Sequence, residues 1–160
     1  MGVSGTGKTT LAGFIAEKFS VELMEADDFH PPENIAHMAL GQGLTDAMRE
    51  PWLKSMCDHI RVSDGPLSLA YSGLKHPHRE RFRCLGLPVI FLHLQGDFDV
   101  IHQRMNNRVG HFFPATLLKS QYDDLDDTTN ESDIISIDVN GDLSSIFHVA
   151  SRAVDNFLNQ

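Results

Sequence analysis

The sequence has few basic residues and no long apolar run. Its 160 residues contain 13 lysines and arginines against 22 aspartates and glutamates, which gives a formal net charge of −9. Nucleic-acid phosphates require a basic face, so we expect no nucleic-acid partner. No apolar stretch reaches the length that crosses a bilayer, which predicts a chain with no membrane partner.

Cysteine is also scarce, and the two that occur, Cys57 and Cys84, do not have the spacing of a metal site. With no targeting segment recognisable, they are expected to be reduced thiols, and the expected compartment is the cytoplasm. A chain of 160 residues with 41% hydrophobic and 22% charged residues is typical of one globular domain, covering residues 1–160.

What the sequence does have is a complete G-x-x-x-x-G-K-[ST] motif, which begins at its second residue. The glycines let backbone N–H groups approach phosphate oxygens, while Lys8 supplies a charge that reaches the terminal phosphates. The Thr9 hydroxyl is placed to bind Mg²⁺, and the apolar-periodic helix that follows adds its dipole. The predicted nucleotide-binding residues of this loop are Gly2, Val3, Ser4, Gly5, Thr6, Gly7, Lys8, Thr9 and Thr10.

Helical and strand patterns alternate after the motif. Strands are predicted at 21–24, 66–71, 89–94 and 134–137, and helices at 9–19, 34–40, 46–60, 76–85, 99–107 and 143–158. Asp46 is expected to cap the helix at 46–60, residues 25–32 to form a polar loop, and residues 110–125 to hold a loop and a short helix. This alternation predicts an α/β domain with the three-layer P-loop NTPase fold, a parallel sheet flanked by helices.

The strand that normally precedes such a loop, at the centre of the sheet, is missing, because only Met1 stands before the motif. Burying about five apolar side chains is worth on the order of 10 kcal/mol, which is comparable to the whole stability of a domain. Two explanations stay open: the start lies inside a longer natural chain, which we favour, or the sheet is gapped.

Acidic residues follow the predicted strand at 21–24, in the run Glu25-Ala26-Asp27-Asp28. At a strand end beside a phosphate loop, carboxylates suit two tasks: holding hydrated Mg²⁺, or accepting a proton from a hydroxyl that attacks the γ-phosphate. We interpret Asp27 as the group that orients the attacking hydroxyl. Together with Lys8 it forms the predicted catalytic pair, and Glu25 is a candidate metal ligand beside Thr9.

Four ordered groups of residues resemble the gluconate kinase family. They are 27–53, with Asp27-Asp28-Phe29-His30-Pro31 and Pro51-Trp52-Leu53; 72–83, with Ser72-Gly73-Leu74-Lys75; 96–114; and 117–121. The resemblance runs from Gly2 to about Asp138 and implies a gluconokinase, which phosphorylates gluconate to 6-phosphogluconate with ATP and Mg²⁺. It also suggests a homodimer. The sequence departs from the family pattern at Glu25-Ala26, where Asp-Gly is usual.

Gluconate is an anion with many hydroxyls, so its site should offer cations and polar groups. The predicted substrate-binding residues are Asp27, His30, Asn34, Arg49, Lys75, Arg79 and His111. Resemblance to nucleoside-kinase-like folds further suggests that Arg104 stacks on adenine and that Arg108 reaches phosphate across a mobile lid around residues 108–130, with Gly110 as its hinge.

Two other functions stay open. One is a kinase of a related sugar acid or a shikimate-like substrate. The other is a nucleotide-binding protein with impaired catalysis, which the missing strand and Glu25-Ala26 would explain. A GTPase is disfavoured, because no Asn-Lys-x-Asp motif occurs.

Overall fold

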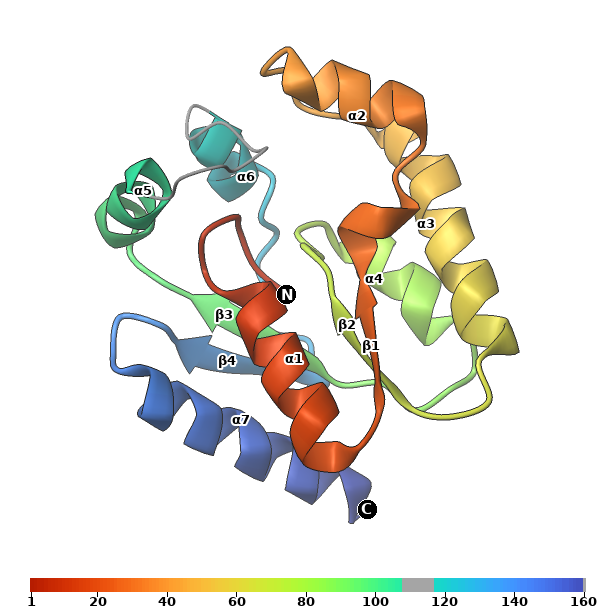
Figure 1. Ribbon diagram of the computed structural model, residues 1–160, viewed down its shortest axis with the longest axis vertical. Coiled ribbons are helices and arrows are strands. Elements are labelled where there is room, and N and C mark those ends of the chain that lie inside the picture. The colour runs from red at the N-terminus through yellow and green to blue at the C-terminus, as the bar shows by residue number, and fades with distance from the viewer. Residues whose placement is uncertain (108–116, 160) are drawn as a thin grey trace.

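The computed structural model describes residues 1–107 and 117–159. In this part of the chain the strands are β1 (Glu22–Glu25), β2 (Leu67–Ala70), β3 (Phe91–Gln95) and β4 (Ile134–Asp138). The helices are α1 (Lys8–Phe19), the 3₁₀ helix η1 (Ala26–Phe29), α2 (Pro32–Ala39), α3 (Asp46–Val62), α4 (His76–Arg83), α5 (Phe98–Asn106), α6 (Leu118–Asp123) and α7 (Leu143–Leu158). Figure 1 shows their arrangement.

The sheet consists of two parallel halves. In one half β1 pairs with β2, with Glu22 opposite Leu67, and in the other β3 pairs with β4, with Phe91 opposite Ile134. No strand is described between β2 and β3, so the gap expected from the sequence is present in residues 1–107 and 117–159.

The backbone of Met1 and Gly2 joins the two halves. The Gly2 N–H donates to the Ser72 carbonyl, just after β2, at 2.8 Å. On the other side, the Leu94 N–H of β3 donates to the Met1 carbonyl at 2.9 Å, and the Met1 amino group donates to the Leu92 carbonyl at 2.5 Å. Two residues therefore stand where a central strand would lie, and the phosphate loop leaves from this position.

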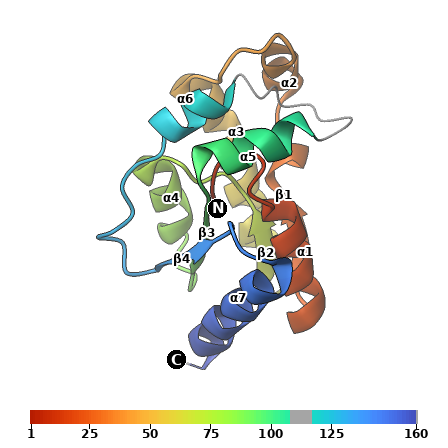
Figure 2. The same ribbon diagram turned by 90° about the vertical axis from the view of Figure 1, so that its left-hand side faces the viewer.

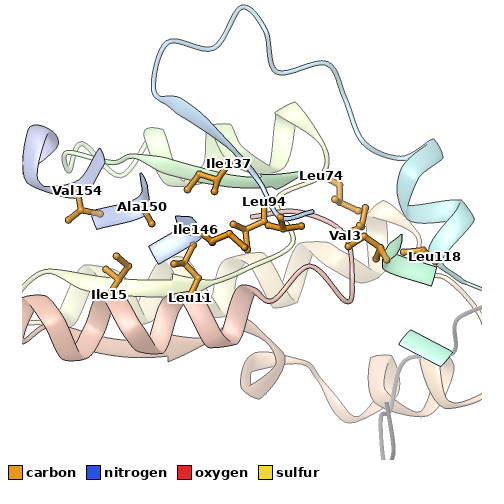
Figure 3. Close-up of a cluster of buried hydrophobic side chains, with 12 residues drawn as sticks. Val3, Leu11, Ile15, Leu74, Leu94, Leu118, Ile137, Ile146, Ala150 and Val154 are labelled. Carbon is orange, nitrogen blue, oxygen red and sulfur yellow. The ribbon is translucent and has the colours of Figure 1, made fainter. Parts of the chain in front are cut away.

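Helices cover the sheet on both sides. Helices α1 and α7 pack on one face around a cluster that includes Leu11, Ile15 and Ala150, and Figure 3 shows these side chains directed toward one another. On the other face, Trp52 and Met56 of α3 pack with Phe82 of α4. The three-layer arrangement predicted from the alternating pattern is confirmed. The helices α1 and α7 lie beside each other in Figures 1 and 2.

Some element boundaries differ from the sequence prediction. Strand β3 begins at Phe91 rather than Val89, because its partner β4 begins only at Ile134 and leaves the two preceding residues without a ladder. Helix α3 is capped by Thr45, whose hydroxyl accepts from the Met48 N–H at 3.3 Å, and not by Asp46, which is the first helical residue. The expected polar loop at 25–32 includes η1. Among the described residues, no helix combines the length and the apolar character needed to cross a membrane.

The buried His93 of β3 makes the stability of the fold sensitive to pH. The residue is 2% exposed, and desolvation by burial, with the nearby Met1 amino group and Arg79 as lesser causes, lowers its pKa to about 4. The unfolded chain therefore binds a proton at His93 between pH 6.5 and about 4, where the folded protein does not.

We expect the free energy of unfolding to decrease as the pH falls through this window, by about 1–3 kcal/mol from His93 alone. The H93Q variant should lose less stability over the same window, as measured by urea unfolding at a series of pH values. An identical pH profile for the two proteins would contradict the assignment to His93.

Candidate active site

The phosphate loop wraps the N-terminus of α1. Gly7 caps the helix in the left-handed conformation, with φ 95°, and no side chain caps the first turn. The first N–H groups of α1 therefore remain available to an anion, and the helix dipole favours negative charge there. Gly5 also has a positive φ of 84°, and a Cβ at this position would stand 2.7 Å from Met105 Cγ of α5. A glycine is thus required where the loop passes under α5.

Side chains of the loop are held within it. Lys8 Nζ donates to the Val3 carbonyl at 2.9 Å, and the Thr6 hydroxyl donates to the same carbonyl at 2.9 Å. These contacts place the Lys8 ammonium over the loop, close to the N-terminus of α1. The chemistry that the sequence predicts for residues 2–10 is compatible with this geometry.

Glu25, at the end of β1, faces the start of α1. The Thr9 hydroxyl donates to Glu25 Oε2 at 3.2 Å, while Glu25 Oε1 is buried without a hydrogen-bond partner among the described residues. Burial is the main cause that raises the pKa of Glu25. An orphaned carboxylate oxygen beside a hydroxyl fits a hydrated divalent cation, so the longer side chain at this departure from the family pattern still reaches the loop.

A pocket of about 370 Å³ opens beside the phosphate loop, and Arg104 lies on it. The Arg104 guanidinium donates to the Val139 carbonyl at 2.8 Å, which holds it at the loop after β4. The pocket is also lined by Gly141, Leu143 and Phe147, which the sequence analysis did not identify. The only signal for them was their position after the last predicted strand, where ligands bind in such sheets.

On the other side of the loop, η1 carries Asp27 at the surface. The Asp27 side chain is 93% exposed, and its Oδ1 lies 4.0 Å from His30 Nε2. His30 stacks on Trp52 with 4.1 Å between ring centroids, and the Trp52 indole N–H donates to the Ala26 carbonyl at 2.6 Å. Burial lowers the pKa of His30, which keeps its ring neutral at pH 7. The packing of Trp52 thus fixes η1 and leaves the Asp27 carboxylate accessible.

Two cationic side chains, Arg49 of α3 and Lys75 after β2, contact the same two carboxylates. Arg49 donates to Asp46 at 2.7 Å and to Asp124 at 2.9 Å. Lys75 donates to Asp46 at 2.9 Å and lies 3.6 Å from Asp124. His78 lies 3.7 Å from Asp46 and had not been identified from the sequence, although it stands one helical turn after Lys75. Burial is the main cause that lowers the pKa of His78, so Arg49 and Lys75 alone are called the cation cluster.

Two predicted substrate ligands have structural contacts instead. Arg79 is fully buried: its guanidinium pairs with Glu131 and donates to the carbonyls of Gly73 and Leu74 at 2.7 and 2.9 Å. Asn34 is 3% exposed and donates to the Met48 carbonyl at 2.9 Å. The structure therefore corrects the prediction for Arg79, because this side chain has no exposed surface that a substrate could contact. Arg79 instead holds the turn that precedes Lys75. Asn34 joins α2 to α3.

The predictions for Arg108, Gly110 and His111 lie outside the described residues, as does the first part of the lid predicted around 108–130. The described part of that segment includes α6, which packs on the core through Leu118.

A phosphate loop that leaves the centre of a parallel sheet and caps the next helix, with an acidic segment after the neighbouring strand, defines a P-loop nucleotide-binding protein of the kinase type. Comparison with known proteins agrees. The chain is 38% identical to the thermosensitive gluconokinase of Escherichia coli over 164 residues, covering 96% of this chain and 84% of that one. It is 39% identical to the gluconokinase of Gluconobacter oxydans, covering 86% and 79%.

A solved structure, a gluconokinase from Sinorhizobium meliloti, superimposes with a TM-score of 0.89 at 36% identity, over 98% of this chain and 89% of that one. No family model matches the chain. The length and identity of the matches show that the chain belongs to the gluconokinase family.

The role of Arg79 can be tested by stability. We expect R79M to lower the free energy of unfolding by about 2–4 kcal/mol. It leaves the carbonyls of Gly73 and Leu74 without their donor and removes one of the two arginines that pair with Glu131. Arg81, on the same helix, pairs with Glu50 and is about half exposed, so R81M is the matched control and should cost less than about 1 kcal/mol. Urea unfolding of both variants measures the difference, and equal losses would contradict a structural role for Arg79.

Proposed function

We propose that the protein transfers the γ-phosphoryl group of ATP to a hydroxyl of gluconate, giving 6-phosphogluconate. The observation that carries this proposal is the arrangement around the phosphate loop. Glu25 ends the strand beside it and Asp27 follows that strand. Lys75, after the next strand, shares its carboxylate partners with Arg49 of α3. The names of the relatives supply the particular substrate.

The phosphate loop and α1 would bind the triphosphate. Backbone N–H groups at the start of α1 and the Lys8 ammonium would neutralise the phosphate oxygens, and Arg104 would lie against the base in the adjoining pocket. Thr9 and Glu25 would hold Mg²⁺, which when bound offsets charge on the β- and γ-phosphates.

Asp27 would act on the acceptor hydroxyl. Its exposed carboxylate can accept the hydroxyl proton while the oxygen attacks phosphorus and the bond to the ADP oxygen breaks. The His30 ring is 6% exposed and packs on Trp52, so it would support Asp27 from beneath rather than offer a surface to the substrate.

The cation cluster would bind the carboxylate of gluconate. Arg49 and Lys75 are 17% and 26% exposed in their side chains, so both can reach a ligand at the surface. Their present partners, Asp46 and Asp124, keep the charges paired until a substrate carboxylate takes their place. The same cations would bind the carboxylate of other sugar acids, so an activity assay on each acid has to identify the preferred substrate.

The direct test is ADP release with Mg-ATP and each of gluconate, related sugar acids and shikimate. We expect gluconate to give the highest kcat/KM, and K8A to reduce turnover by at least about a hundredfold while the fold is retained, because Lys8 stabilises the transferring phosphoryl group. A higher kcat/KM with another acid would identify that acid, rather than gluconate, as the preferred substrate. ATP binding without turnover on any acceptor would favour a non-catalytic nucleotide-binding protein.

The role of Asp27 leads to a second prediction. D27N should reduce kcat about 100-fold or more and leave the Kd for Mg-ATP within about twofold, because the amide cannot accept the proton but carries no contact to the nucleotide. Asp28, adjacent on η1, provides the matched control, and D28N should retain most of the activity. Equal losses in kcat and in ATP affinity would argue against a proton acceptor at Asp27.

A further inference from the structure

Helix α6 contacts the phosphate loop through one side chain, that of Gln121. The Ser4 N–H, inside the loop, donates to Gln121 Oε1 at 2.6 Å, across 117 residues of sequence. Loop N–H groups bind either phosphate or protein, so this contact fixes the direction of the peptide between Val3 and Ser4.

The position of α6 is itself fixed by the core. Leu118, at its first residue, is fully buried in the cluster that contains Val3 and Ile101. Figure 3 shows Leu118 at the same end of this cluster as Val3. One residue after Gln121, the Tyr122 hydroxyl donates to the Gly96 carbonyl at 2.8 Å. Gln121 therefore projects from an anchored helix and not from a free loop.

The C-terminal end of α6, where Gln121 also lies, reaches the cation cluster. Asp124, which follows the helix, accepts from Arg49 at 2.9 Å and lies 3.6 Å from Lys75. Gln121 of α6 thus contacts the phosphate loop, and Asp124, which caps the same helix at its C-terminus, contacts the cation cluster.

We propose that Gln121 is a positioning residue for phosphoryl transfer. It holds the Ser4 peptide of the phosphate loop, and through α6 and Asp124 it keeps that loop in register with the cations that receive the acceptor. The inference rests on the proposed function for the identity of the acceptor. The contact between Gln121 and the loop does not depend on it.

The physical reason is that phosphoryl transfer depends on alignment more than on covalent chemistry. An error of about 1 Å in the placement of reacting groups can cost on the order of a hundredfold in rate. A side chain that aligns the loop without binding a substrate should therefore affect kcat more than the KM of either substrate.

The first experiment compares Q121M and Q121E in the full chain. Methionine has a similar length but offers no oxygen, so we expect kcat to fall about 10- to 100-fold with both KM values within about threefold. Exchange of the Ser4 amide proton, followed by NMR, should accelerate at least about tenfold. Glutamate retains an accepting oxygen, so Q121E should keep the Ser4 amide protected.

Two further variants isolate the path through α6. K119A removes an exposed side chain of the same helix and should keep kcat within about twofold of the wild type. In a double-mutant cycle, Q121M and D124N should be less than additive in kcat, because both act through one helix.

A folded Q121M protein with wild-type kcat would overturn the proposal, as would unchanged exchange at Ser4. If the wild-type chain phosphorylates no acid, the proposed function fails. The exchange measurement then still decides whether Gln121 holds the loop.

Discussion

The site depends on the backbone hydrogen bonds that Met1 and Gly2 make to both halves of the sheet. Ser72 lies on one side of these two residues, and Leu92 and Leu94 lie on the other. Because the phosphate loop begins at this junction, its direction is set by both halves. The acidic segment after β1 and the turn after β2, which carries Lys75, are placed by one half. The pocket that Arg104 and the residues after β4 line lies beside the other half. Met1 and Gly2 therefore fix where the loop stands between the two halves, and Gln121 contacts it at Ser4.

The basic side chains of the cation cluster are each paired with carboxylates, in a chain that has few basic residues. Arg49 and Lys75 share Asp46 and Asp124, and the Lys75 hydrogen bond is the main cause that lowers the pKa of Asp46. Arg79 is instead buried against Glu131, where it lowers the pKa of that carboxyl to about 2. The two arginines therefore differ in exposure: Arg49 keeps an accessible surface, where we propose that a substrate carboxylate binds, and Arg79 has none and supports the turn before Lys75.

Local patterns were sufficient to predict much of this arrangement. The spacing of Gly7 and Lys8 placed the loop and the start of α1, and the alternation of strands and helices predicted the layers. What could not be predicted came from distant contacts: Arg79 meets Glu131 across 52 residues, and Ser4 meets Gln121 across 117. The cap at Thr45 was assigned one residue late, since Thr and Asp are both good caps and only the backbone angles separate them.

The central claim is that the loop leaving the sheet junction binds a triphosphate. Titration calorimetry of the purified protein with Mg-ATP tests it without reference to any acceptor. We expect one site per chain with a Kd below about 1 mM, and weaker binding for Mg-ADP because Lys8 then lacks the γ-phosphate. A folded protein that releases no heat of binding with millimolar Mg-ATP, and is not stabilised by it against thermal unfolding, would contradict the account.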